Sequence, residues 1–317
     1  MQTDSKAPIS TIQALRKNSE RILSDVRTSV SDLCSSHNAS IVAFGSIARG
    51  EFSSESDLDY SILVDAEDGS EEISAIHDCI REFCGTRGIR LPSQGGAFGS
   101  RITIESLYKT IGGKDDTNEN LTRRLLTLLE STSLDNGNQV EGVRRQILER
   151  YVERLSPNNV ARFLLNDIIR YYRTICVDFE YKTRGGKSWG DRRIKLAYSR
   201  KLIYISGIIA VLSTKGKARE GVVDQLLSYF AMTPLDRIHG FLDSEHVVRI
   251  FDHYDFFLSE MAKRETRQEL TRLNSPDVAR KSPIFAALKK RSEQFNKEIL
   301  NALIGKYSYD ELELILL

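Results

Sequence analysis

The first third of the chain switches between helix-like and strand-like spacing of its apolar residues. Apolar residues recur every three to four positions over residues 11–37, which predicts an amphipathic helix. The short apolar run 41–46 ends in Gly-Ser, and the run 57–65 alternates in polarity, so each predicts a strand. Ser70, followed directly by two glutamates, predicts the start of the next helix. The order helix, strand, loop, strand, helix is that of a mixed α/β unit.

The rest of the chain keeps helical periodicity and loses its strand signals. Residues 91–100 are rich in Gly, Pro and Ser and predict a loop or an irregular strand, whereas residues 115–131 predict a helix. Beyond residue 140, predicted helices span 140–155, 159–182, 192–212, 221–232, 236–264 and 282–304. The sequence therefore predicts an α+β fold class: a mixed α/β core in residues 1–140, then an all-helical, bundle-like domain in residues 141–317.

Length and composition favour an ordinary globular protein. The 317 residues suffice for two domains, and 40% hydrophobic with 28% charged residues is typical of a folded chain. No apolar stretch reaches the roughly 18 residues of a membrane span, and the first residues lack the apolar core of a signal peptide. We therefore expect a cytoplasmic protein without a membrane partner. The formal net charge of +1 means that any attraction of nucleic acid must come from a local patch.

Several common kinds of site have no counterpart in the sequence. The four cysteines are scattered without a CxxC pair, so we expect reduced thiols at partly buried helix positions. The five histidines lack the spacing of a zinc site. A Gly-x-x-x-x-Gly-Lys sequence is missing, which excludes a P-loop enzyme, and no nucleophile elbow is present.

The Gly-Ser at the end of the first predicted strand has the character of a phosphate-binding turn. Gly45 lets a ligand approach the backbone closely. Free N–H groups where the chain turns into a helix, together with the Ser46 hydroxyl, suit a phosphate group. Arg49 lies one turn further on and can add a positive charge at the same point.

Two aspartates open the second predicted strand and share one of its faces. Asp57 and Asp59 are then about 7 Å apart along the strand. Carboxylates at this spacing can converge on one or two hard cations, and oxygen ligands suit Mg²⁺, which also binds substrate phosphates. The plain alternative is a pair of solvated acids on an edge strand. The opposite face carries the apolar residues Leu58, Tyr60, Ile62 and Val64.

The sequence GSIARGEFSSESDLD, residues 45–59, resembles the signature of the DNA polymerase β-like nucleotidyltransferase superfamily. The Ser-Asp-Leu-Asp form, with Ala-Arg-Gly after the Gly-Ser, is similar to the minimal and bacterial regulatory members. The resemblance implies that Gly45 and Ser46 bind the nucleoside triphosphate and that Asp57 and Asp59 are catalytic and hold Mg²⁺ or Mn²⁺. Arg49 and Ser56 complete the predicted nucleotide-binding set.

By this resemblance the protein moves a nucleoside monophosphate from an NTP to an acceptor hydroxyl and releases pyrophosphate. The acceptor stays open between an RNA or tRNA end, a protein side chain, another nucleotide as in oligonucleotide messenger synthesis, and a small-molecule antibiotic. A toxin or phage-defence role is also within the habits of the superfamily. A non-enzymatic alternative is a degenerate copy of the fold that only binds nucleotide or a protein partner. The presence of both aspartates disfavours this alternative.

The sequence departs from the superfamily in one respect. Many members supply a third carboxylate from a later strand, often as the base for the acceptor hydroxyl. Between Glu82 and Glu105 this chain has no Asp or Glu, and the next candidates are Glu105, Asp115 and Asp116. The base is therefore left unassigned.

Further polar residues are candidates for contacts with nucleotide or acceptor. Residues 182–201 hold eight Lys or Arg, one acid and the only tryptophan, Trp189, a composition that suits phosphates or a stacked base. Asn166, Arg170 and Arg173 form a polar stripe on one face of the predicted helix 159–182, for which the structural alternative is a solvated helix face. For 182–201 the alternative is an interhelical loop with Trp189 anchored in the core. The candidate contacts are Asp116, Arg123, Asn166, Arg170, Arg173, Lys187, Arg192 and Lys195.

Overall fold

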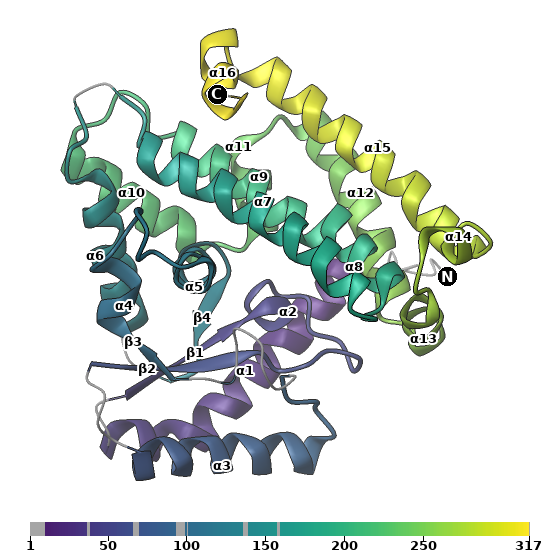
Figure 1. The fold of residues 1–317 in the computed structure, drawn as a ribbon, viewed down its shortest axis with the longest axis horizontal. Helices are drawn as coiled ribbons and strands as arrows, with labels where there is room; N and C mark the ends of the chain where they lie inside the picture. The colour runs from purple at the N-terminus through teal and green to yellow at the C-terminus, as the bar shows by residue number, and fades with distance from the viewer. Residues whose placement is uncertain are drawn as a thin grey trace, which may run out of the picture.

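A small mixed sheet lies between a pair of helices and a large helical assembly (Figure 1). The computed structural model describes residues 10–36, 39–65, 70–92, 99, 101–135, 139–156 and 159–316. Helices α1 (Thr11–Ser36) and α3 (Ser70–Arg87) cover one face of the sheet, and the short α2 (Gly45–Ala48) follows the first strand. The strands are β1 (Ala39–Phe44), β2 (Tyr60–Val64), β3 (Arg101–Thr103) and β4 (Ser131–Ser133).

The sheet has the order β3-β2-β1-β4. Strand β1 pairs antiparallel with β2 and β4, and β2 pairs parallel with β3. Beside and beyond the sheet lie α4 (Ile104–Tyr108), α5 (Asn118–Leu129), α6 (Gln139–Val152) and α7 (Arg162–Arg184). They are followed by α8 (Trp189–Lys195), the π-helical turn η1 (Leu196–Arg200), α9 (Lys201–Leu212), α10 (Arg219–Ala231), α11 (Pro234–Phe241), α12 (Ser244–Met261), α13 (Arg264–Arg272), α14 (Pro276–Ala279), α15 (Pro283–Lys306) and α16 (Tyr309–Leu316).

Strand β2 separates two apolar cores, which explains its composition. Tyr60, Ile62 and Val64, together with Leu58, pack in the core that includes α1 and α3. Leu63 packs on the other side, in the core of the helical assembly. Because both faces are covered, all five residues of the strand are buried. The apolar face predicted from the alternation is therefore the face that packs on α1 and α3.

The predicted α+β fold class is confirmed, with differences in the details. The predicted helix 192–212 consists of α8, η1 and α9, and the predicted helix 236–264 is divided into α11 and α12. Strands β3 and β4 were not predicted because three residues are too few to show a period. Most of the predicted loop 91–100 lies outside the described residues. The domain boundary at residue 140 stays a prediction.

One apolar core crosses that boundary, since it joins residues from Ile12 to Tyr307. Among the described residues, no helix combines the length and the apolar character that a membrane crossing needs.

Two fully buried arginines have very different surroundings. Arg124 in α5 donates hydrogen bonds to Asp116 at 2.8 Å, to Asp167 at 3.1 Å and to the Tyr151 hydroxyl at 2.7 Å. Arg237 in α11 donates to a backbone carbonyl, but its Nε and Nη1 have no hydrogen-bond partner among the described residues. Burial, followed by the nearby Arg144 charge, lowers the pKa of Arg237 to about 9. Arg124 is thus compensated by two carboxylates, and Arg237 by none in direct contact.

These surroundings predict opposite effects for the same substitution. Arg124→Met leaves the buried carboxylates of Asp116 and Asp167 with only the half-exposed Arg170 beside them, so we expect a loss of about 3 kcal/mol in the free energy of unfolding. Arg237→Met removes a buried charge that lacks a carboxylate contact, so we expect unchanged or higher stability. Urea unfolding of both variants measures the difference, and equal destabilisation of the two would contradict it.

Candidate active-site cleft

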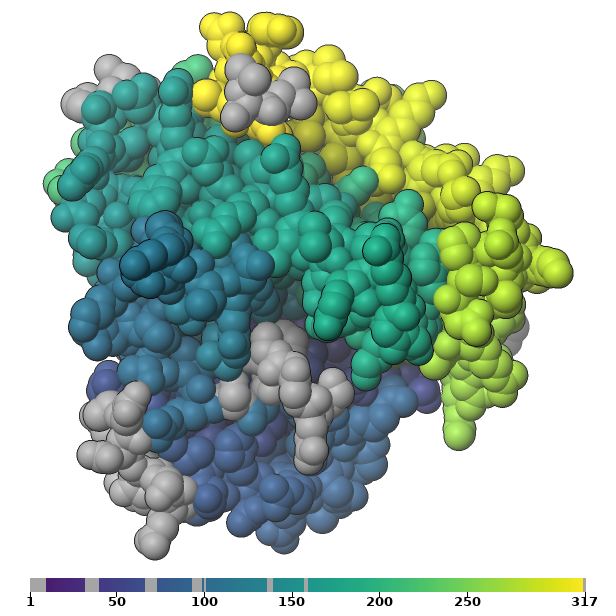
Figure 2. Space-filling view, in the orientation of Figure 1, coloured from purple at the N-terminus to yellow at the C-terminus, as the bar shows by residue number. Residues whose placement is uncertain are grey.

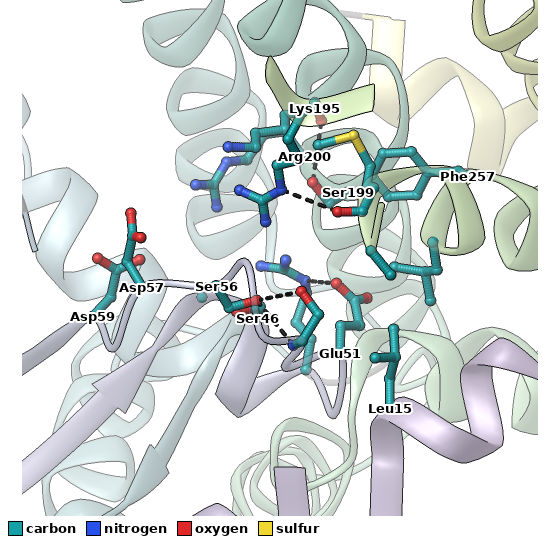
Figure 3. Close-up of a pocket in the computed structure, with 17 residues that line it drawn as sticks. Leu15, Ser46, Glu51, Ser56, Asp57, Asp59, Lys195, Ser199, Arg200 and Phe257 are labelled. Atoms are coloured by element: carbon teal, nitrogen blue, oxygen red, sulfur yellow. Dashed lines mark hydrogen bonds and ion pairs between the residues drawn. The ribbon is translucent and has the colours of Figure 1, made fainter. Parts of the chain in front are cut away.

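A cleft opens where the turn after β1 faces the helical assembly (Figure 3). Its open space, including the solvent-filled mouth, is about 690 Å³. One wall comes from the α/β core and the other from η1, α12 and α13 with their flanking residues. The polar side chains on these walls include Ser46, Ser56, Asp57 and Asp59 on the first, and Lys195, Ser199, Arg200 and Arg267 on the second.

The sheet seats Asp59 directly against Gly45. The Phe44 amide donates to the Asp59 carbonyl at 2.9 Å, which continues the pairing of β1 with β2 to the edge of the cleft. Gly45 has a φ of +72°, and a Cβ at this position would lie 2.8 Å from Asp59 Oδ2. Glycine is therefore required here both for its backbone conformation and for the space that the carboxylate occupies.

Asp57 stands at the open end of the same wall. Its side chain is 48% exposed, and Arg90 Nε donates to its carboxylate at 2.9 Å. The backbone also holds this position, because the Leu58 amide donates to the Arg90 carbonyl at 2.8 Å. Figure 3 shows the carboxylates of Asp57 and Asp59 side by side. Both acids line the cleft. They do so from the segment before β2, because the strand predicted over 57–65 begins only at Tyr60.

The surroundings of Asp59 suit a bound cation. Burial is the main reason why the pKa of the Asp59 carboxyl is raised to about 6. The charges of Arg200 and Lys195 oppose this rise, and those of Asp57 and Glu130 add to it. A positive ion between the two aspartates would offset this unfavourable charge. Two carboxylates fit Mg²⁺ or Mn²⁺ when substrate phosphates and water supply the other ligands. Among the described residues, no group of three or more His, Cys, Asp or Glu forms a metal site by itself.

A buried cluster of ion pairs lies under the cleft. Arg49 contacts Glu51 at 2.6 Å and Glu130 at 2.8 Å. Glu130 is also 3.3 Å from Arg200 of η1, and the Tyr254 hydroxyl of α12 donates to Glu51 at 2.7 Å. The cluster therefore connects α2, the end of α5, η1 and α12. The charge of Arg49, predicted to contact phosphate, is already compensated by two carboxylates.

Comparison with known proteins finds a family model, and it matches the part of the chain that carries Gly45 and the two aspartates. Residues 23–87 match the family model of the nucleotidyltransferase domain. The chain carries a nucleotidyltransferase domain. The match is consistent with the polymerase β-like superfamily, and it includes the turn at Gly45 and both aspartates. No curated protein matches the chain.

Ser56, the other predicted nucleotide-binding residue of the nucleotidyltransferase domain, stabilises its own loop. It is buried, and its hydroxyl accepts a hydrogen bond from the Ser53 amide at 3.0 Å and lies 3.2 Å from the Ser53 hydroxyl. It thereby shapes the chain just before Asp57.

Most of the other predicted contacts do not lie with the aspartates of the nucleotidyltransferase domain. Asp116 is buried between Arg124 and Arg170, with Arg170 Nη1 at 3.2 Å, because a buried carboxylate needs cationic partners. Arg123 pairs with Glu119 of its own helix at 2.7 Å. The structure also places Asn166 and Arg173 on the exposed surface of α7, outside the cleft lining.

Within the basic segment, Lys195 lines the cleft and pairs with Asp191 at 2.9 Å. Lys187 and Arg192 lie outside the lining.

The candidate third acids also lie elsewhere: Glu105 pairs with Lys109 at 2.8 Å, and neither Asp115 nor Asp116 lines the cleft. Glu51 lines the cleft and the charge of Glu130 acts on Asp59, but arginines hold both carboxylates.

Sequence reasoning missed Arg200, Ser199 and Arg267 on the helical wall of the cleft. Arg200 ends the π-helical turn η1 and its side chain is 27% exposed. Such turns are rare and often accompany functional sites. The only signal for Arg200 in the sequence was its place in the basic segment 182–201, because a π turn leaves no sequence pattern. Arg267 carries no signal at all, because it is one of several charges in the short helix α13.

The contact between Gly45 and Asp59 predicts a selective effect of a methyl group. Gly45→Ala strains the backbone by about 1–3 kcal/mol and pushes the Asp59 carboxylate aside, so we expect loss of Mg²⁺-dependent stabilisation by NTPs. Gly88→Ala is the matched control, because Gly88 has a φ of +64° but nothing within 4 Å of its added Cβ. Thermal unfolding with and without Mg²⁺ and NTP compares the two. Retained NTP stabilisation in Gly45→Ala would argue against the assigned site.

Proposed function

We propose that this protein is a Mg²⁺- or Mn²⁺-dependent nucleotidyltransferase that moves a nucleoside monophosphate from an NTP to an acceptor hydroxyl. The nucleotidyltransferase domain supports transfer of this general kind. The observation that carries the proposal is the seating of Asp59 against the Gly45 turn, with Asp57 beside it. This arrangement supports joint binding of triphosphate and metal at one end of the cleft.

The triphosphate would lie between the two walls of the cleft. The backbone at Gly45 and Ser46 can approach phosphate oxygens, since α2 begins there. Lys195 and Arg267 face the same space from the helical wall. Arg200 is only partly compensated, at 3.3 Å from Glu130, and can donate to phosphate as well. These cations support binding of a multiply charged donor.

The chemistry is largely positioning and charge neutralisation. Asp57 and Asp59 would hold the metal, which when bound neutralises the triphosphate and the departing pyrophosphate. The acceptor oxygen forms a bond to the α-phosphorus while the bond from that phosphorus to the bridging oxygen breaks. Pyrophosphate leaves with the electron pair. We assign the acceptor's proton to solvent, because Glu51 and Glu130 are both held by arginines.

Transfer of label tests the proposal directly. Purified protein is incubated with each α-³²P-labelled NTP and Mg²⁺, alone and with total RNA or cell lysate. We expect label in an acceptor band, and a decrease of at least about 100-fold in Asp57→Asn and Asp59→Asn, as for other losses of charge stabilisation. Asp78→Asn, which alters an exposed aspartate of α3, should keep full activity.

Binding separates the possible failures. Saturating NTP at 100 times its dissociation constant should add about 2.7 kcal/mol to stability, which a thermal shift detects. NTP binding without any transfer would favour a nucleotide-binding or interaction module in place of an enzyme. Absence of both binding and transfer would overturn the assignment.

A further inference from the structure

Positive charge is concentrated in two segments next to the cleft. Residues 182–201 and 263–281 together contain 14 Lys or Arg and four Asp or Glu, an excess of ten positive charges. The whole chain has a formal net charge of only +1, so the remaining residues carry an excess of nine negative charges. This uneven distribution of charge creates a strongly positive local potential on a nearly neutral protein.

The two segments form one continuous surface, the basic face. The amides of Trp189 and Gly190 donate to the Leu273 carbonyl at 3.0 and 2.8 Å, which fastens α8 to the end of α13. Figure 2 shows the two segments, teal and yellow-green, as neighbours on one side of the molecule. Each also supplies the cleft with a cation, Lys195 from the first and Arg267 from the second. The basic face therefore runs into the candidate active site.

Many cations of the basic face have no acidic partner. Lys182 pairs with Asp178 and Arg280 with Asp277. Within the part of the chain that the structure describes, ion pairs are lacking for exposed or half-buried side chains that include Arg184, Lys187, Arg192, Arg193, Arg264 and Arg272. Most of these are arginines, whose planar fork matches the oxygens of phosphate. Uncompensated arginines in this number suit a partner with several phosphates.

An exposed aromatic ring accompanies these charges. Tyr181, at the end of α7, is 77% exposed, and the chain turns back beside it through a hydrogen bond from Gly185 at 3.2 Å. An exposed ring among cations can stack on a nucleobase. Trp189, by contrast, packs against Phe179 and Phe285 with ring centroids at 6.1 and 5.4 Å, so it anchors α8 in the core.

We propose that the basic face binds a single-stranded polynucleotide and leads its terminal hydroxyl into the cleft as the acceptor. This inference rests on the proposed nucleotidyl transfer. The terminal oxygen would form the bond to the α-phosphorus of the NTP, pyrophosphate would leave, and the strand would become one nucleotide longer. Phosphates along the strand match the arginines, and a base matches Tyr181. An acidic protein would satisfy the charges but not the exposed ring.

Salt-dependent binding tests the basic face without relying on activity. Fluorescently labelled single-stranded RNA and DNA of mixed sequence are titrated with the full chain by anisotropy at several salt concentrations. Loss of two phosphate contacts in Lys187→Ala/Arg193→Ala should reduce the slope of log K against log salt by about 1.4. The matched control is Arg154→Ala/Arg162→Ala, two exposed arginines near the α6–α7 junction, also without an ion pair among described residues. It should leave the slope unchanged.

The outcomes separate this inference from the proposed transfer. Binding of either polynucleotide with the expected difference between variants supports it, and comparing RNA with DNA identifies the polymer. Equal effects in the two double variants would overturn it, as would equally tight binding of polyglutamate or of phosphatidylserine vesicles. NTP stabilisation and transfer to another acceptor without polynucleotide binding would overturn this inference alone. Lack of NTP binding would overturn the proposed function instead, whatever the result with polynucleotide.

Discussion

The buried carboxylate of Glu130 holds together two walls that the chain builds far apart in sequence. It lies between Arg49, from the turn after the first strand, and Arg200, from the π-helical turn. In a poorly solvated interior, two arginines that contact the same carboxylate would repel each other strongly if its negative charge were absent. Glu51 and Tyr254 extend the same cluster to α12. The cluster therefore ties α2, the end of α5, η1 and α12 to one another beneath the cleft.

The part of the candidate site around Gly45 and Asp59 was predictable because it is local in sequence. Gly45 and Asp59 are joined by one loop between paired strands, so a strand, a turn and an alternating pattern suffice to bring them together. Buried charges were harder to predict, because a charge pattern does not reveal its partner. Arg49 has the right residue type for a phosphate contact, yet its partner Glu130 lies 81 positions away. Ser56 similarly serves its own loop.

The helical wall illustrates the limit of periodicity. The spacing of apolar residues predicted helices over η1 and α12, but not the short, highly charged α13. It also says nothing of where a helix changes its hydrogen-bonding pattern or which charged face meets the cleft. Arg170 and Asp116 looked like candidates for the cleft, but they pair with each other instead: Asp116 is buried just before α5, and the partly exposed Arg170 reaches it from α7. Arg267 reaches the cleft only through the packing of α13 on α8, a long-range contact that leaves no mark in the local sequence.

At the π turn Leu196–Arg200, the number of residues and their winding decide which side chains face the cleft. A π turn contains one residue more than regular α-helical winding needs. In regular α-helical winding, residues five positions apart, such as Lys195 and Arg200, point about 140° away from each other. The extra residue of the π turn brings them toward one side, and both line the cleft. Deleting one residue of the π turn would let α8 and α9 merge into one regular helix and leave the two cations four positions apart, still on one side. Relatives of this chain that lack the extra residue should therefore keep a positively charged helical wall, whereas those that keep the length but lose the π winding should not.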